Sequence, residues 1–113
     1  MTNTSAPADK SPKNGKKAAV YVSGPMTGLP DLNRPKFNSE ADLLRAQGFT
    51  VVNPAESVLP ESATWKEHMR EDIRAMLDCD RIHMLPGWER SRGAVLELTI
   101  AHALGFTVTN AKR

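Results

Sequence analysis

Apolar residues recur along this chain in short runs and in helical stripes, separated by polar segments that contain Gly and Pro. Short runs rich in β-branched residues predict strands, and apolar residues three and four positions apart predict amphipathic helices. Four runs fit strands, at residues 18–23, 49–52, 81–85 and 106–109. Helical stretches separate them, at residues 34–47, 65–77 and 92–105.

Local signals predict where the first two helices begin and which faces point inward. Asn33 is placed to cap the first helix, which takes Pro35 in its first turn and stops before Gly48. Thr64 and Glu67 form a capping-box pattern at the start of the second helix. The residues expected to face the core from these helices are Phe37, Ala41, Leu43, Leu44, Trp65, Met69, Ile73, Met76 and Leu77. The Met and aromatic stripe of the second helix is therefore interpreted as core rather than as a cofactor site.

Alternation of strand and helix predicts a parallel sheet with helices on both faces. We expect one α/β domain, a three-layer Rossmann-like or flavodoxin-like fold with four or five mainly parallel strands. This domain is expected over residues 18–113. It follows a Lys-rich tail at residues 1–17, which has no large apolar residue after Met1 and is expected to be disordered.

Composition narrows the class of protein. The net charge of +2 is concentrated in the tail, where four Lys and one Asp give +3 and leave about −1 for the domain. A near-neutral domain has no basic surface for gripping a nucleic-acid backbone, so no specific nucleic-acid partner is expected. No apolar run approaches a membrane span of ~20 residues. The single cysteine, Cys79, excludes an internal disulfide and fits a reducing cytoplasm, where we expect the protein to reside.

Glu97 is a charged residue in a helix that is otherwise apolar on almost every side, which predicts a buried helix. Its helical neighbours include Gly93, Ala94 and Ile100, and none of these can pair with a carboxylate. Burial of an unpaired carboxylate costs several kcal/mol or forces protonation. Such a residue is expected to face a ligand. The alternative is a Glu in the first turns that the helix dipole favours.

Two loops are placed to form a binding site with Glu97. In a parallel sheet, ligands bind beyond the carboxyl ends of the strands, and residues 23–28 and 88–93 follow the first and third strands. The second loop offers backbone N–H groups, the Ser91 hydroxyl and the guanidinium groups of Arg90 and Arg92, which together favour an anion. Neither loop matches a dinucleotide fingerprint or a P-loop, and an ordinary turn explains Gly and Ser at a strand end equally well.

Tyr21 and Asp72 are candidate partners for Glu97. Tyr21 lies two residues before the first loop, so its hydroxyl can reach the carboxylate, although a core role is an open alternative. Asp72 lies beside the apolar stripe of the second helix and offers a second carboxylate, unless it is simply solvated. His68, His83 and His102 have no metal-ligand spacing with one another or with Cys79, so no metal site is expected. No other cofactor is expected either. Two carboxylates are typical of glycoside chemistry, in which one attacks the sugar carbon and an acid assists the leaving group.

Several motifs resemble the DUF4406 family, which looks like a compact branch of the nucleoside 2-deoxyribosyltransferase superfamily. The likeness extends over about residues 18–109. The residues that carry it are Tyr21-Val22-Ser23-Gly24-Pro25-Met26-Thr27-Gly28, Phe37-Asn38, Val52-Asn53-Pro54-Ala55-Glu56, Asp72, Asp80, Ser91-Arg92-Gly93-Ala94-Val95-Leu96-Glu97-Leu98, Ala101 and Gly105.

The resemblance implies a role for each matching residue. Glu97 matches the nucleophile, Tyr21 the residue that orients it, and Asp72 the acid that contacts the base or leaving group. Ser91 matches the serine that binds the 5′-phosphate in the monophosphate glycosidases. The residues expected to bind substrate are Ser23, Gly24, Pro25, Met26, Phe37, Trp88, Ser91, Arg92 and Gly93.

The sequence also departs from the superfamily pattern. Ala94, Val95 and Leu96 stand between Gly93 and Glu97, where Val95 and Leu96 are expected to narrow the sugar pocket. The C-terminal extension that donates an Asn in the transferases is absent from the given sequence, which favours hydrolysis over base exchange.

These observations favour a hydrolase that cleaves the N-glycosidic bond of a (2′-deoxy)nucleoside 5′-monophosphate or nucleoside. A non-catalytic nucleotide-binding domain and a nucleoside deoxyribosyltransferase are the alternatives, and a protein-interaction module that uses the Lys-rich tail is a third. Enzymes of the superfamily complete their pockets across subunits, so the resemblance also implies a homodimer or a higher homo-oligomer.

Overall fold

A single parallel sheet forms the centre of the computed structural model, which describes residues 19–60 and 62–112. Its strands lie in the order β2-β1-β3-β4. Their bounds are Ala19–Ser23 for β1, Thr50–Val52 for β2, Arg81–Met84 for β3 and Thr107–Asn110 for β4. Every neighbouring pair is parallel. The tail predicted at residues 1–17 lies outside the described residues.

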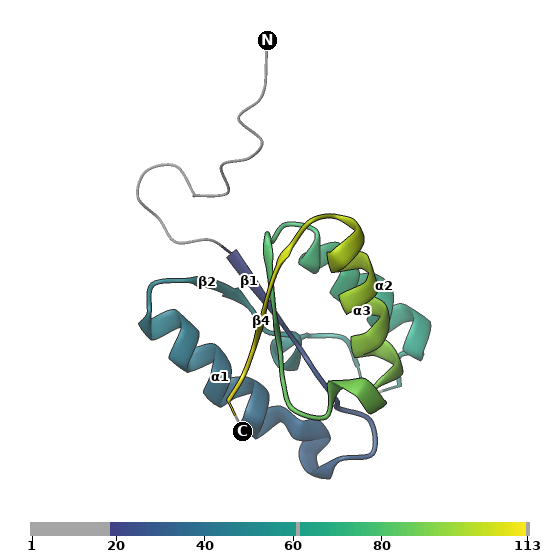
Figure 1. The fold of residues 1–113 in the computed structure, drawn as a ribbon. Coiled ribbons are helices and arrows are strands. Elements are labelled where there is room, and N and C mark those ends of the chain that lie inside the picture. Colours follow the sequence, from purple (N-terminus) through teal and green to yellow (C-terminus); the bar gives the residue numbers. More distant parts are fainter. Residues whose placement is uncertain (1–18, 61, 113) are drawn as a thin grey trace.

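Helices cover both faces of this sheet (Figure 1). Helix α1 (Arg34–Ala46) packs on one face, and helices α2 (Trp65–Met76) and α3 (Arg92–Ala103) lie on the other. Within the described residues, short 3-10 turns connect the elements: η4 (Pro30–Asn33), η5 (Pro54–Glu56) and η6 (Trp88–Arg90). The predicted three-layer α/β fold with a parallel sheet of four or five strands is confirmed, with four strands. None of the helices described is both long and apolar enough to cross a lipid bilayer.

Residues of β1 alternate between two hydrophobic cores, as the period of a strand requires. Val20 and Val22 belong to the core beneath α1, which includes Phe37. Tyr21 belongs to the core beneath α2 and α3. Ser23, two residues further along the strand, lies on the same side as Tyr21. The strand therefore presents two hydroxyl groups to the layer that contains α3.

The direction in which the sheet grows reverses at β1. The chain runs from β1 to β2 on one side and then crosses to β3 on the other side of β1. Ser23 and Met84 are paired at the carboxyl ends of β1 and β3. In open α/β sheets the loops diverge at such a point and leave a crevice for ligands. The two loops singled out in the sequence flank this crevice.

Capping of the first two helices was predicted correctly at one of the two positions. The capping box of α2 is present, because Thr64 Oγ1 accepts from Glu67 N at 3.1 Å and Glu67 Oε1 accepts from Thr64 N at 2.7 Å. Asn33 occupies the N-cap position of α1 but makes no capping bond. It adopts a left-handed conformation, with φ of 60°, and its Nδ2 donates to the Pro25 carbonyl at 3.0 Å instead. Asn33 thus anchors the loop after β1 rather than the helix.

Two leucines that were predicted to face the core are exposed. Leu43 is 53% exposed and Leu77 is 52% exposed. Leu43 lies outside the buried stripe of α1, which is formed by Phe37, Ala41 and Leu44. Leu77 is the C-cap residue of α2, and its neighbour Met76 takes the buried position at that end of the helix.

The expectation that α3 is buried on almost every side is wrong. Ala94, Glu97 and Ala101 form its buried face, whereas Val95 is 41% exposed and Leu96 is 36% exposed. An outer-layer helix contacts the sheet along one stripe only. The opposite face of α3 therefore exposes the apolar Val95 and Leu96 in the single chain, beside the polar Thr99 and His102.

Candidate active site

Close packing at the start of α3 sets the position of Glu97. Ser91 caps the helix, since its Oγ accepts from Ala94 N at 3.1 Å. A Cβ atom on Gly93 would lie 3.0 Å from Met69 Sδ, so any larger residue there would require the Met69 side chain to shift. Glu97 lies about one turn further into the helix, on the face that packs against β1.

Both oxygens of the Glu97 carboxylate accept a hydrogen bond from a hydroxyl group of β1. Tyr21 Oη donates to Oε2 at 2.7 Å, and Ser23 Oγ donates to Oε1 at 2.7 Å. Glu97 itself is only 5% exposed, and both donors are fully buried. The carboxylate is therefore held by neutral donors, and no salt bridge is found for it among the described residues.

Burial raises the pKa of Glu97 to about 7, although the hydrogen bonds from Tyr21 and Ser23 lower it. The charge of Asp72 contributes a smaller upward shift. Burial, followed by the charge of Glu97, also raises the pKa of Tyr21 well above its ordinary value. Tyr21 consequently keeps its proton near neutral pH and remains a donor to the carboxylate.

A cleft of about 1120 Å³ opens in front of Glu97 at the carboxyl ends of β1 and β3. Pockets for drug-sized ligands span about 300–1,000 Å³, so the cleft is large enough for a nucleotide. Most of the site residues predicted from the sequence line it: Tyr21, Ser23, Gly24, Pro25, Met26, Phe37, Asp72, Ser91, Arg92, Gly93 and Glu97. The fold therefore brings the two loops and both carboxylates to one cavity.

Asp72 contributes the second carboxylate to this cleft, from α2. Burial raises its pKa to about 6, although the charge of His68 opposes the shift. No hydrogen bond or ion pair of its carboxyl group is found within the described part of the chain. It also lines a smaller cavity of about 190 Å³, together with Tyr21 and Asn53. Asp72 is thus a half-buried, unpaired acid rather than a solvated residue of the helix surface.

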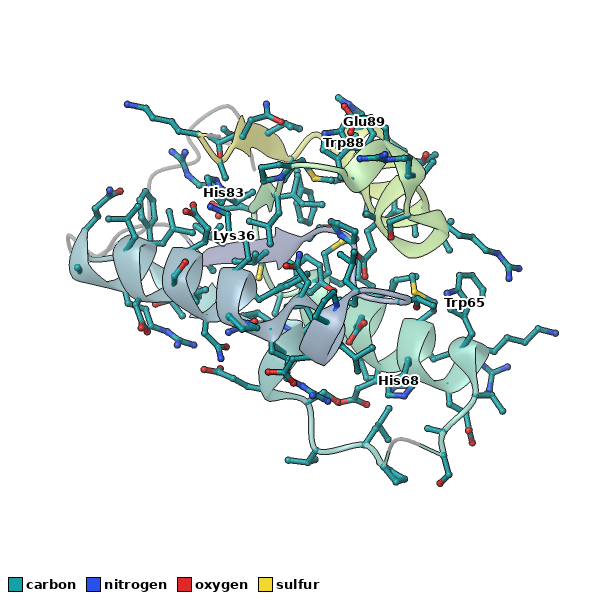
Figure 2. The ribbon with its side chains drawn as sticks, turned by 90° about the horizontal axis from the view of Figure 1, so that it is seen from below. Lys36, Trp65, His68, His83, Trp88 and Glu89 are labelled. Atoms are coloured by element: carbon teal, nitrogen blue, oxygen red, sulfur yellow. The ribbon has the colours of Figure 1, made fainter. Side chains whose placement is uncertain are left out.

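The two tryptophans have the opposite placement to the one predicted. Trp88 does not line the cleft, because the turn η6 directs it against the core beneath α2 and α3. Trp65, predicted as core, does line the cleft, and the Arg92 guanidinium lies over its ring at 3.7 Å from the centroid. In Figure 2 the two residues lie well apart, Trp65 on α2 and Trp88 on the turn before α3.

One wall of the cleft was missed because α2 was interpreted as a core helix. Trp65, His68, Met69 and Asp72 all line the cavity, with the spacing of a single helix face. Asp72 was the available signal. A carboxylate in the middle of an apolar stripe indicates that the stripe faces a cavity along part of its length.

The left-handed turn before α1 also contributes lining residues that the sequence did not reveal. Asp31, Leu32 and Arg34 line the cleft, and Asp31 and Leu32 have φ of 49° and 52°. Non-glycine residues rarely adopt this conformation. No sequence pattern indicated it.

Gly24 explains part of the motif Ser23-Gly24-Pro25. A Cβ atom at this position would lie 2.7 Å from Leu85 Cβ, closer than real Cβ contacts come. The loop after β1 can leave the sheet beside Leu85 only because residue 24 has no side chain.

Metal and thiol chemistry gain no support from the geometry. Within residues 19–60 and 62–112, no group of three His, Cys, Asp or Glu side chains is arranged to hold a metal ion. Burial, and then the charges of Asp78 and Asp80, raise the pKa of the Cys79 thiol to about 11. A thiol with such a pKa stays protonated and is a poor nucleophile.

Comparison with known proteins identifies the family of the chain and a solved structure with a similar fold. Residues 18–110 match the family described as "Domain of unknown function (DUF4406)". A search of curated proteins found no match. A 2-desoxiribosyltransferase from Leishmania mexicana has a similar structure, with a TM-score of 0.65 and 22% sequence identity. The similarity covers 82% of this chain and 63% of the Leishmania protein, so the chain spans less than two thirds of that protein's length.

Proposed function

The chain belongs to the DUF4406 family, and from that premise and its site we propose that it hydrolyses the N-glycosidic bond of a (2′-deoxy)nucleoside 5′-monophosphate or nucleoside. The observation that carries this proposal is that two carboxyl groups, the buried Glu97 and the half-buried Asp72, line the same nucleotide-sized cleft. Its fold, shared with a 2-desoxiribosyltransferase, agrees with this chemistry.

Glu97 acts as the nucleophile in the first step. A carboxylate oxygen attacks the anomeric carbon of the sugar, the bond from that carbon to the base nitrogen breaks, and its electron pair leaves with the base. Tyr21 and Ser23 hold the carboxylate in place during this attack. The product of the step is a glycosyl ester on Glu97.

Asp72 supplies the proton that the leaving base needs. Its raised pKa of about 6 keeps part of the carboxyl population protonated near neutral pH, as a general acid requires. In the second step the ionised Asp72 removes a proton from water, and the resulting hydroxide attacks the anomeric carbon. The ester bond breaks, Glu97 regains its charge, and the products are a free base and a sugar or sugar phosphate.

The start of α3 is suited to the 5′-phosphate. Ser91 uses a lone pair of Oγ to cap the helix, so its hydroxyl proton remains free to donate to an anion. Arg92 has its guanidinium stacked on Trp65 at the edge of the cleft. No carboxylate pairs with Arg92 among the ion pairs of the described residues. A guanidinium held in this way is a natural phosphate ligand.

The proposal is tested by incubating the protein with a panel of deoxyribonucleoside and ribonucleoside monophosphates and their nucleosides. Release of free base is followed by chromatography. We expect release from at least one monophosphate, and its loss in Glu97→Gln. Glu89→Gln is the matched control, since Glu89 is an exposed glutamate outside the cleft. Equal release by the wild type and Glu97→Gln would contradict the proposal.

Two alternatives are separated by the same assay. A deoxyribosyltransferase releases little base on its own but forms a new nucleoside when a second base is added, as expected if a base rather than water attacks the ester on Glu97. A non-catalytic binding domain gives neither product, yet calorimetry shows nucleotide binding that survives Glu97→Gln.

A further inference from the structure

Ser23 and Tyr21 contact the same carboxylate from one strand. Side chains two residues apart on a strand share a face, which brings both hydroxyls to Glu97. Tyr21 bonds Oε2 and Ser23 bonds Oε1, each at 2.7 Å. The resemblance assigned the orienting role to Tyr21 alone and placed Ser23 among the substrate ligands.

The geometry points to Ser23 as a positioning residue for Glu97 rather than a substrate ligand. This inference rests on the proposed function for its catalytic meaning, since it assigns Ser23 to the nucleophile of that reaction. Ser23 is fully buried, and its one hydroxyl proton is already donated to Glu97. A serine hydroxyl has no second proton to offer a ligand.

Two hydrogen-bond donors on different oxygens fix the orientation of the Glu97 carboxylate more completely than a single donor can. With Tyr21 alone, the carboxylate could still rotate about its last side-chain bond while keeping one hydrogen bond. A second donor on the other oxygen fixes the plane of the group, and each oxygen keeps one free lone pair. Those remaining lone pairs are the ones available to a substrate in the cleft. Small misplacements of a nucleophile are costly in rate, so a fixed plane favours attack.

Ser23 also opposes the effect of burial on Glu97. A hydroxyl that donates to a carboxylate stabilises the ionised form, which is the nucleophilic one. Loss of one of two such donors is expected to leave the second hydrogen bond in place but to make ionisation harder. The side chain of Ser23 therefore contributes both geometry and charge state.

Substitution of each donor tests the assignment by a readout that does not depend on activity. We compare wild type, Ser23→Ala and Tyr21→Phe by NMR titration of the Glu97 side-chain carboxyl carbon. Thr99→Ala is the matched control, because Thr99 lies on the same helix, is exposed and donates its hydroxyl to the Val95 carbonyl. We expect the titration midpoint to rise by about one pH unit in each donor variant and to stay unchanged in Thr99→Ala.

Kinetics add the catalytic half of the test. If base release is detected, Ser23→Ala should lower kcat about tenfold with little change in KM, and should move the acid limb of the pH profile upward. A Glu97 titration in folded Ser23→Ala that is identical to wild type would overturn the inference. So would a rise in KM with kcat unchanged, because that result identifies Ser23 as a substrate ligand. Failure of the proposed function would differ from both, since the wild type would release no base while the titration midpoint still moved.

Discussion

At the scale of single residues, the site retains a carboxylate where burial disfavours its charge. Glu97 has a pKa raised from 4.5 to about 7 by burial. Between these two pH values the folded state binds more protons than the unfolded state. The contribution of Glu97 to the free energy of unfolding is therefore greatest below about pH 4.5 and is lost as the pH rises through 7. The shift corresponds to a cost of about 3 kcal/mol above pH 7.

We expect Glu97→Gln to remove this pH dependence while abolishing base release. The Tm of the variant minus the Tm of the wild type should be several degrees larger at pH 8 than at pH 5. At pH 8 the wild type must bury a charged Glu97, whereas glutamine carries no charge to bury. Thermal unfolding at both pH values measures it. Comparison across pH cancels any constant effect of the amide group on hydrogen bonding. A difference in Tm that is equal at pH 5 and pH 8 would show that burial does not raise the pKa of Glu97.

The pH dependence of catalysis is expected to be bell-shaped. Attack needs Glu97 ionised, and departure of the base needs Asp72 protonated, with pKa values of about 7 and about 6. Since the charge of Asp72 raises the pKa of Glu97, the two limbs report the pair rather than either residue. The optimum of kcat/KM should lie between about pH 6 and 7.

Asp72→Asn should remove the alkaline limb of that profile and lower the rate by about 100-fold. A base that departs without protonation, such as 7-methylguanine, should recover most of the loss, because only the proton donor is missing. An alkaline limb that persists in Asp72→Asn would assign the acid to another residue.

At the scale of elements, the cleft depends on the contact between the N-terminal part of α2 and the N-terminus of α3. Met69 and Trp65 lie against the start of α3 at Gly93, and Trp65 supports the Arg92 guanidinium at 3.7 Å. A cation stacked on an indole is stabilised by roughly 0.5–2 kcal/mol, depending on exposure. The pair therefore orders the charge that we assign to the phosphate.

Trp65→Leu is expected to weaken binding of a deoxyribonucleoside monophosphate by about threefold to tenfold, because Arg92 loses its support. Binding of the matching nucleoside should change less, since it has no phosphate. Calorimetry with both ligands in the Glu97→Gln background measures the two effects without turnover. Trp65→Phe, which keeps an aromatic ring, is the control, and its affinity for the nucleotide should lie between those of Trp65→Leu and the protein with Trp65 intact. An equal loss for nucleotide and nucleoside would show that Trp65 contacts the base or sugar instead.

A second set of contacts ties α1 to the sheet outside the cleft. His83 Nε2 lies 2.9 Å from Glu40 Oε1, and His83 Nδ1 lies 2.8 Å from Thr109 Oγ1. Glu40 also approaches Lys36 at 3.5 Å, and Figure 2 shows Lys36 and His83 on the α1 side of the molecule. A hydroxyl, an imidazole and a carboxylate thus stand in line, but none of them lines the cleft.

We expect this chain of contacts to be structural. Glu40→Ala should lower the free energy of unfolding by about 1–2 kcal/mol, because it leaves a buried imidazole without one partner. Urea unfolding measures the change. Glu71→Ala is the matched control, since Glu71 forms an exposed pair with Arg74 and should change stability by less than about 0.5 kcal/mol. Equal losses in the two variants would contradict a role for the buried contact.

Periodicity predicted the elements well but predicted their surroundings less well. Each strand and helix was located because a period of two or 3.6 is a property of the sequence itself. What surrounds a helix in the folded protein is set by tertiary packing and is not a property of the helix sequence. Trp65 faces a cleft and Leu77 faces solvent, although both fit the apolar stripe of α2. The contact between Glu97 and Tyr21 was predicted because a charge in an apolar helix and a hydroxyl near a strand end are visible in the sequence. The second hydroxyl, from Ser23, follows only from how β1 and α3 pack.

At the scale of the whole molecule, the exposed face of α3 is the feature that a single chain leaves unexplained. Val95 and Leu96 are adjacent, large and exposed, and they lie on the helix whose other face carries Glu97. Contiguous exposed apolar surface marks contacts with other proteins, and we propose that Val95 and Leu96 belong to such a surface. The occupant we propose is a second copy of this chain, in keeping with the family resemblance.

We therefore expect a homo-oligomer that α3 helps to hold together. Sedimentation velocity should show a dimer or larger species for the wild type and a monomer for Leu96→Lys, since a buried charge in an apolar interface is costly. Leu43→Lys is the matched control, because Leu43 is 53% exposed on α1 at the opposite face of the sheet and should leave assembly unchanged. If the cleft is completed across the contact, Leu96→Lys should also raise KM more than it lowers kcat. A wild type that stays monomeric at every concentration would contradict the proposed contact through α3.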